Sequence, residues 1–279
     1  MNVDALKIRA RVMRQIREFF DSRGFVEVET PVRIAAPAPE PHIDCPAVAP
    51  ADRPTFLRAS PELQMKKLLA SGMERIYQIG PCFREGERGR RHNPEFTMLE
   101  WYRANADYLD ILADMESLVA EVLGIPSPFG RLAVRDAYRK WAGWDPFTDW
   151  DADRFDVDMA TKIEPNLPES PVFLMDYPPA AASLSRVRGD VAERWELYVE
   201  GMELANAFSE LVDAGEQRRR FERAREERRH IGEADYPIDD EFLDMLSRMP
   251  PSGGVALGVD RLVMLVCGAN DISTVRVDM

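Results

Sequence analysis

Residues 74–104 carry charged side chains in a pattern suited to binding a phosphate or a charged small molecule. Apolar residues at period two predict one strand that ends at Arg84 and a second strand in which Phe96, Glu100 and Tyr102 share a face. The nine residues after Arg84 hold three arginines, two glutamates, two glycines and a histidine. A loop with this charge density is unsuited to a core, and its arginines suit a polyphosphate. A hairpin whose charged loop is only solvated is the alternative interpretation of this stretch taken alone.

Two further glutamates predict a cation site later in the chain. A tight turn at Glu200-Gly201 is expected to join two strands. If the residues flanking this turn pair, Glu196 and Glu203 lie on one face, roughly 5 to 8 Å apart. Two carboxylates at this separation raise each other's pKa unless a cation lies between them. Oxygen ligands completed by substrate phosphates suit Mg²⁺. An exposed acidic hairpin without a metal is the alternative for the pair alone.

After Glu203, polar and aromatic residues recur at every second position, but these are the even-numbered positions, whereas Glu203 is odd-numbered. Asn206, Phe208 and Glu210 would point to the other face of a straight strand. A β-bulge between Glu203 and Asn206 would bring both sets to one pocket, and we predict this bulge. Ala207 would be strained if the bulge required a positive φ.

A glycine-rich segment near the C-terminus, residues 252–265, predicts a strand that runs into a helix. Asp260 is expected to cap this helix. Arg261 falls in its first turn, where a cation is unfavourable for the helix dipole. This position indicates an anion-binding role for Arg261.

Regular elements around these segments must position the candidate residues. Amphipathic periodicity predicts helices over residues 4–23 and 107–124, and dense charge of both signs indicates a solvated helix over residues 215–232. Alternation predicts a strand over residues 25–31, and a run of apolar residues predicts one over residues 172–178. Ser60 and Pro61 are typical of a helix start, and Gly72 of its end. Glu62 then lies in the first turn, where the helix dipole favours a carboxylate.

The motifs resemble those of class II aminoacyl-tRNA synthetases. Arg84, followed eight residues later by His-Asn-Pro-Glu-Phe-Thr-Met-Leu-Glu, is similar to the second signature motif in its lysyl-type form. The first helix and strand with Pro31 resemble the first motif, and the segment ending at Arg261 resembles the third. The resemblance implies an α+β fold with an antiparallel β-sheet flanked by helices. It also implies one catalytic domain over residues 1–279 and a homodimer.

The resemblance further implies ligand-binding residues, with ATP and Mg²⁺ as the ligands. For ATP they are Arg84, Glu85, Glu87, His92, Asn93, Phe96, Glu196, Glu203, Leu204, Gly258 and Arg261. For the amino acid they are Ser60, Pro61, Glu62, Glu100, Tyr102, Asn206, Phe208, Glu210 and Ala256. Arg84 and Arg261 are expected to be catalytic, and Glu196 and Glu203 to hold the metal. Gly86 occupies the usual place of an adenine-reading glutamate, and we expect Glu87 to replace it.

The composition limits the classes of function. A net charge of −13 over 279 residues argues against a broad nucleic-acid surface, so no tRNA partner is expected. Three separated cysteines indicate neither a disulfide framework nor a zinc site. The sequence contains no long apolar run of a membrane span and no signal peptide. We therefore expect a cytoplasmic protein that binds no membrane.

The acceptor is predicted from the position of the first motif. Lysyl-tRNA synthetases carry an anticodon-binding barrel ahead of it, whereas here it begins within ten residues of Met1. The chain is therefore similar to the stand-alone paralogues that attach (R)-β-lysine to a lysine of translation elongation factor P.

The predicted pocket favours a diamino acid. Glu62, Glu100 and Glu210, with Tyr102, would pair two ammonium groups, since an unpaired buried charge is costly. Ala256 replaces a pocket glycine and should favour a β-amino acid by roughly 1 to 3 kcal/mol. The alternatives are a truncated lysyl-type ligase with α-lysine and another acceptor, and a non-catalytic regulatory paralogue that binds an amino acid.

Overall fold

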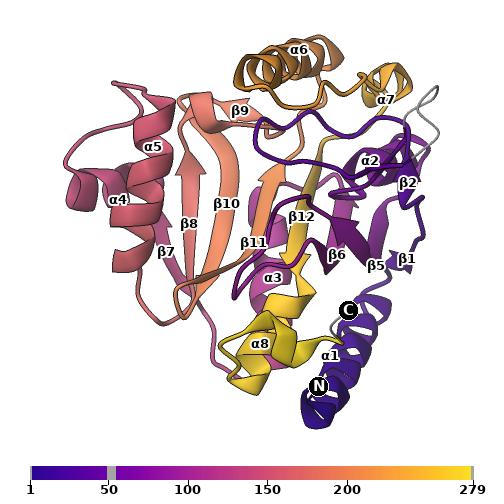
Figure 1. The fold of residues 1–279 in the computed structure, drawn as a ribbon, viewed down its shortest axis with the longest axis vertical. Coiled ribbons are helices and arrows are strands. Elements are labelled where there is room, and N and C mark those ends of the chain that lie inside the picture. The colour runs from indigo at the N-terminus through magenta and orange to yellow at the C-terminus, as the bar shows by residue number, and fades with distance from the viewer. Residues whose placement is uncertain (1, 49–54, 278–279) are drawn as a thin grey trace. The chain divides into compact units, whose positions relative to one another are not determined.

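The computed structural model describes residues 2–48 and 55–277. The chain forms two compact units. The first unit comprises Met1–Ala104, Val212–Pro250 and Gly258–Met279, and the second comprises Asn105–Leu211 and Pro251–Leu257. Helices and mainly antiparallel strands occur in both units, which confirms the predicted α+β composition (Figure 1). Within the described residues, none of the helices has the length and apolar character needed to span a membrane.

A long hairpin forms the sheet of the first unit. β5 (Arg75–Phe83) pairs antiparallel with β6 (Glu95–Ala104), and β1 (Val26–Glu27) pairs parallel with β5. Gln78 lies opposite Glu100, and Cys82 lies opposite Phe96. Phe96 and Glu100 therefore share a face, as period two predicted. β1 is shorter than the predicted strand over residues 25–31.

Two helices from opposite ends of the chain lie side by side in the first unit (Figure 1). They are α1 (Val3–Asp21) and α8 (Val259–Cys267). The ring of Phe20 in α1 contacts those of Tyr77 and Trp101, with centroids 4.7 and 5.0 Å away. This aromatic contact fixes α1 against the β5–β6 hairpin and accounts for the apolar stripe in its sequence.

The rest of the first unit consists of shorter elements. α2 (Glu62–Ala70), α6 (Ala214–Ile231) and α7 (Asp240–Leu246) are its other α-helices within the described residues. β2 (Arg33–Ile34), β4 (Thr55–Leu57) and β3 (Ala47–Val48) form a small antiparallel sheet in that order. A 3-10 turn, η5 (Ile272–Val275), follows α8.

The second unit contains a larger sheet. Its strands run in the order β12 (Ser252–Gly258), β11 (Met202–Ser209), β10 (Val191–Val199), β8 (Val172–Tyr177) and β7 (Gly130–Ala133). Only the β7–β8 pair is parallel among these, and β9 (Val187–Arg188) pairs with β10. The helix α3 (Tyr108–Leu123) packs on β10 and β11, and the Asp107–Asp110 capping box starts it. The predicted helix over residues 107–124 is confirmed.

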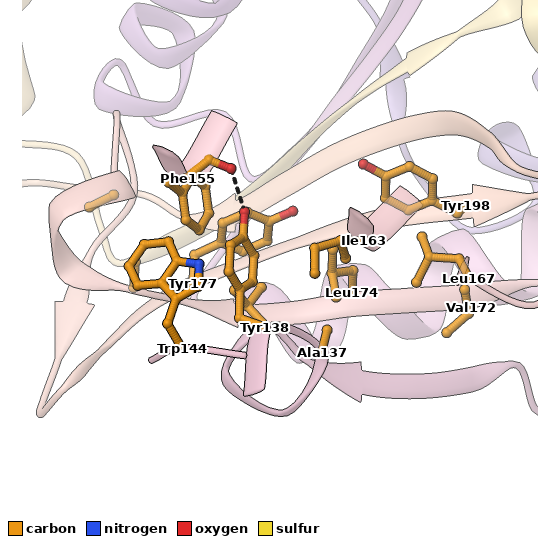
Figure 2. Packing of buried hydrophobic residues seen from close by; sticks show 13 residues of the cluster. Ala137, Tyr138, Trp144, Phe155, Ile163, Leu167, Val172, Leu174, Tyr177 and Tyr198 are labelled. Carbon is orange, nitrogen blue, oxygen red and sulfur yellow. Dashed lines mark hydrogen bonds between the residues drawn. The ribbon is translucent and has the colours of Figure 1, made fainter. Parts of the chain in front are cut away.

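Short helices with an aromatic core follow β7, in a region where the sequence indicated no function. They are α4 (Val134–Ala137), η1 (Tyr138–Ala142), α5 (Ala152–Asp158), η2 (Met159–Ile163), η3 (Glu164–Asn166) and, after β8, η4 (Pro179–Ala181). Figure 2 shows Tyr138 stacked on Phe155 beside Trp144, with Tyr177 and Tyr198 of the sheet in the same cluster. These aromatic rings join the helices to the face of β8 and β10 that carries Tyr198.

Candidate functional site

Arg84 follows the last residue of β5 and presents an incompletely bonded guanidinium. Its backbone N–H donates to the carbonyl of Pro94 at 2.8 Å, and its guanidinium carbon lies 5.2 Å from the ring centroid of Phe96. One terminal nitrogen lies 3.7 Å from a Glu87 oxygen. Its Nε is buried without a hydrogen-bond partner among the described residues. Arg84 can therefore donate to an anion that lies beside the Phe96 ring.

The charged loop after Arg84 is held at both ends. The backbone N–H of Glu85 donates to the carbonyl of Asp44 at 2.8 Å, and the amide of Asn93 donates to the carbonyl of Glu95 at 2.6 Å. Gly86 has a φ of 77°, a conformation that side chains rarely adopt. The backbone conformation therefore explains why a glycine occupies this position. The glutamate expected to replace the adenine-reading one is the next residue, Glu87.

His92 and Arg261 contact each other within the first unit. A terminal nitrogen of Arg261 lies 2.6 Å from His92 Nε2, and its Nε donates to the carbonyl of Arg91 at 3.3 Å. Burial and the positive charge of Arg261 lower the pKa of His92. The ring is therefore neutral near pH 7 and accepts from Arg261 through Nε2. Gly258 precedes the helix, and a Cβ there would lie 3.6 Å from Arg261 Cδ.

Asp260 does not cap α8, so that prediction is wrong. The N-cap is Gly258, without a side-chain hydrogen bond. The Asp260 carboxylate instead accepts from the Thr97 N–H at 2.8 Å and from Arg276 at 2.7 Å, and it also pairs with Arg9. Asp260 thus joins α1, β6 and Arg276, the residue that follows η5, because it lies inside the first turn of α8 and points at the strand.

Buried acids form a second group in the first unit. Glu100 is 1% exposed, and it accepts from the Ser60 hydroxyl at 2.6 Å and from the Tyr102 hydroxyl at 3.0 Å. Burial, followed by the nearby charge of Glu62, raises the pKa of Glu100 to about 7. Pro61 is the helix N-cap instead of Ser60, although Ser60 accepts from the Glu62 N–H at 2.9 Å. Ser60 thereby joins both glutamates.

Two buried cations near these acids were missed from the sequence. Lys66 is 1% exposed and pairs with Glu62 one helical turn earlier. The spacing of four residues could have suggested this pair. Arg58, also 1% exposed, donates to the carbonyl of Thr30 at 2.9 Å, and its charge partly opposes the rise in the pKa of Glu100. No periodic signal in the sequence marks Arg58.

In the second unit, the predicted bulge brings the acidic hairpin and the following residues to one face. Tyr198 lies opposite Glu203, and Glu196 lies opposite Asn206. The register shifts between these pairs and leaves Leu204 without a partner on β10. The parity therefore changes between Glu203 and Asn206, which confirms the bulge.

In β10, β11 and the turn between them, positive φ values occur at the turn and not at the bulge. Glu200 and Gly201 have φ values of 51° and 65°, as a two-residue hairpin turn requires. Ala207 lies opposite Trp195 and Val255 in regular register and has no positive φ. The expected strain at Ala207 is therefore wrong, because the extra residue is three positions earlier.

The pairing of β11 with β12 adds further residues to the face of Glu196. Asn206 lies opposite Ala256, and Phe208 lies opposite Gly254. Glu210, two residues beyond Phe208, is 1% exposed. Asn206, Phe208 and Ala256 therefore belong with the Glu196 carboxylate, as their assignment to one pocket required.

Donors missed from the sequence hold the carboxylate of Glu196. Arg194 donates to Glu196 Oε1 at 2.6 Å and to Asn206 Oδ1 at 3.1 Å. The Tyr198 hydroxyl donates to Glu196 Oε2 at 2.8 Å and lies 3.2 Å from a Glu164 oxygen. Arg194 stands two residues before Glu196, so alternation could have placed it on this face. Its contact with Asn206 depends on the register of the bulged strand.

The donor set around Glu196 and Glu203 fits a magnesium ion that binds together with a nucleotide. Among the described residues, no group of three or more His, Cys, Asp or Glu side chains could hold a metal ion. A pair of carboxylates completed by phosphate oxygens and water is typical of such magnesium. Burial lowers the pKa of Arg194, but the nearby charges of Glu196 and Glu203 raise it above its ordinary value. One cationic group already lies on this face, since a terminal nitrogen of Arg194 is 2.6 Å from Glu196 Oε1.

Comparisons with known proteins agree on one family. The family described as "tRNA synthetases class II (D, K and N)" matches residues 2–277. Proteins named "Elongation factor P--(R)-beta-lysine ligase" are similar over most of the chain. The one from Proteus mirabilis is 38% identical over 301 residues, covering 96% of this chain and 92% of its own. Those from Erwinia tasmaniensis and Salmonella arizonae are 39% and 38% identical, covering 96% and 98% of this chain and 92% and 94% of their own.

Proposed function

This chain belongs to the class II tRNA synthetases of the D, K and N group, and we propose that it is an ATP-dependent ligase that joins (R)-β-lysine to elongation factor P. The observation that carries the proposal is the pair of buried acids Glu62 and Glu100 in the first unit, with the Ser60 hydroxyl bonded to the Glu100 carboxylate and to the backbone N–H of Glu62. A synthetase with such acids suits a cationic amino acid. The relatives that are 38–39% identical point to the particular substrate and acceptor.

Recognition of the substrate follows from the chemistry of these acids. Glu62 lies close enough to Glu100 for its charge to raise the pKa of the Glu100 carboxyl. An ammonium group bound between them would remove this repulsion and favour the ionised form of Glu100. Lys66 already supplies one positive charge to Glu62, so Glu100 is the stronger candidate for the substrate amine.

The first reaction would join the amino acid to AMP. The carboxylate of the amino acid attacks the α-phosphorus of ATP, the bond to the bridging oxygen breaks, and pyrophosphate leaves with that electron pair. Arg84 would bind the carboxylate and the α-phosphate, because its Nε is a buried donor beside Phe96. Phe96 would stack on the adenine, and Arg261 would bind the triphosphate with His92 holding its guanidinium.

Glu196 and Glu203 would bind Mg²⁺ together with the phosphates. When bound, the ion would neutralise charge on the departing pyrophosphate. Both oxygens of Glu196 are oriented by donors, one by Arg194 and the other by Tyr198. This orientation supports the assignment, since a fixed carboxylate loses little entropy on binding a cation.

The second reaction would transfer the aminoacyl group. The ε-amine of a lysine of elongation factor P, once deprotonated, attacks the carbonyl carbon of the adenylate, and AMP leaves as the amide forms. No covalent enzyme intermediate is needed, because the adenylate is itself an activated acyl group.

Ala256 supports a β-amino acid over an α-amino acid. It lies opposite Asn206 on the face of Glu196. A methyl group there reduces the room beside the substrate, where one carbon is worth roughly 1 to 3 kcal/mol.

The proposal also covers the domain organisation, the oligomeric state, the location and the use of tRNA. We propose that it acts as a single catalytic domain in a cytoplasmic homodimer, and that it uses no tRNA. The resemblance of its first helix and strand to the first class II motif supports the homodimer. The net charge of −13 supports a protein acceptor over RNA.

ATP–pyrophosphate exchange tests the proposal. The exchange rate is measured with (R)-β-lysine and with α-lysine, and each activated amino acid is then offered to purified elongation factor P and to tRNA. Faster exchange with (R)-β-lysine, and labelling of the factor alone, are expected. A preference for α-lysine or labelling of tRNA would refute the substrate or the acceptor, and absence of exchange would indicate a non-catalytic paralogue.

A further inference from the structure

The guanidinium of Arg194 in the second unit is largely enclosed and contacts three acceptors. Nη2 donates to Glu196 Oε1 at 2.6 Å, Nε donates to Asn206 Oδ1 at 3.1 Å, and Nη1 donates to the carbonyl of Ala181 at 3.1 Å. Its guanidinium carbon lies 4.4 Å from the ring centroid of Tyr177. The Arg194 side chain is 17% exposed, so it is largely enclosed by these groups.

Two of these acceptors belong to different parts of the proposed site. Glu196 is the proposed magnesium ligand, and Asn206 is a proposed amino-acid ligand. They lie opposite each other on β10 and β11, beyond the bulge. A planar guanidinium has donors at fixed angles, so bonds to both residues hold their polar groups at one separation.

The contact also fixes which end of the Asn206 carboxamide faces outward. A guanidinium can only donate, so the carboxamide oxygen must face Arg194. The amide nitrogen, with its two N–H donors, is then the end left for another group. Without Arg194, the carboxamide could turn and present its oxygen instead.

The Glu196 carboxylate is fixed in a comparable way. Arg194 bonds one of its oxygens and Tyr198 bonds the other, at 2.8 Å. Each carboxylate oxygen has two lone-pair directions, so a single hydrogen bond does not use up the acceptor capacity of either oxygen. The ring of Tyr177 and the carbonyl of Ala181 contact the Arg194 guanidinium. Tyr177 and Tyr198 are themselves packed in the aromatic cluster of Figure 2.

We propose that Arg194 is a positioning residue that holds the cation ligand Glu196 and the amino-acid ligand Asn206 in one fixed geometry, so that both sites depend on a single side chain. The inference rests on the proposed function, because that function assigns the two ligands. A role in folding alone would not link metal binding with amino-acid binding.

Arg194→Gln and Arg194→Lys test the proposal with two separate measurements. The first is the KM for the lysine isomer that the unchanged protein prefers, from pyrophosphate exchange. The second is the dissociation constant for Mn²⁺ in the presence of α,β-methylene-ATP, from the electron paramagnetic resonance signal of free Mn²⁺. Both constants should rise roughly 10-fold to 100-fold in Arg194→Gln, the range for a lost hydrogen bond to a charged group.

Arg194→Lys distinguishes geometry from charge. Lysine keeps the positive charge but lacks the planar fork, so it cannot hold both acceptors. At least one of the two constants should therefore stay raised by about 10-fold. Recovery of both constants by lysine to within about twofold would overturn the proposal. If Arg194→Gln fails to fold, as judged by circular dichroism, Arg194→Lys carries the same test.

Double-mutant cycles and a matched control complete the experiment. Arg194→Gln is combined with Asn206→Ala for KM and with Glu196→Gln for Mn²⁺ binding. Non-additive effects in both cycles support the proposal, and additive effects in either cycle overturn it. The control is Arg135→Gln. Arg135 also pairs with a carboxylate, at 2.9 Å, and lies 4.0 Å from a ring centroid, so its loss should affect stability but neither constant.

Failure of the inference can be told apart from failure of the proposed function. If the unchanged protein exchanges pyrophosphate with neither lysine isomer, the proposed function is refuted. The Mn²⁺ measurement needs no turnover, so Arg194 can still be tested. An active protein with unchanged Mn²⁺ affinity in both Arg194 variants would refute the inference alone.

Discussion

Glu100 should make the folded protein less stable as the pH rises. This carboxylate is 1% exposed, and burial together with the charge of Glu62 raises its pKa from 4.5 to about 7. Between these values the folded chain keeps a proton that the unfolded chain has released. The free energy of unfolding therefore falls as the pH rises through this window, because the unfolded state binds fewer protons.

The magnitude follows from the two pKa values. The gap between 4.5 and about 7, at roughly 1.4 kcal/mol for each pH unit, amounts to about 3 kcal/mol above pH 7. About 2.5 kcal/mol of this loss falls between about pH 5 and pH 8. Glu100→Gln removes the titration and keeps an acceptor oxygen for Ser60 or Tyr102. Relative to the unchanged protein, this variant should gain about 2.5 kcal/mol over that pH interval.

Urea denaturation at both pH values measures this difference. Tyr102→Phe removes a hydrogen bond that lowers the pKa of folded Glu100, so the loss of stability should still begin near pH 4.5 but should extend to higher pH. Glu18→Gln is the matched control, since Glu18 is exposed on α1 and its replacement should leave the pH dependence unchanged. Equal pH dependence in Glu100→Gln and in the unchanged protein would refute the reasoning, because Glu100 would then titrate alike in folded and unfolded chains.

Three further substitutions test the site and its scaffold. Arg84→Lys should lower pyrophosphate exchange by roughly 100-fold to 1,000-fold, because lysine cannot reproduce the Nε donor, and an exchange rate near that of the unchanged protein would argue against the assignment. Ala256→Gly should raise kcat/KM for α-lysine relative to (R)-β-lysine by roughly 10-fold or more, and an unchanged ratio would remove Ala256 from the specificity argument. Gly253→Ala would place a Cβ 2.6 Å from the Ile111 side chain and 2.7 Å from the Asp107 carbonyl, so urea denaturation should show a loss of roughly 1 to 3 kcal/mol.

The sequence by itself determined which residues share a strand face. Period two placed Phe96 with Glu100, and the conflict of parity after Glu203 located the bulge before Asn206. These predictions succeeded because a strand alternates strictly, so a change of parity requires an extra residue. The order of the three motifs likewise identified the family that the comparisons found.

Tertiary structure alone decided which partners the charged side chains have. Arg194 could be placed on the face of Glu196, but its bond to Asn206 depends on the register of β10 with the bulged strand β11. Asp260 is far in sequence from Thr97, which it binds instead of capping its own helix. Local patterns reflect the backbone period, whereas ion pairs and hydrogen bonds depend on distances between segments that only the folded chain brings together.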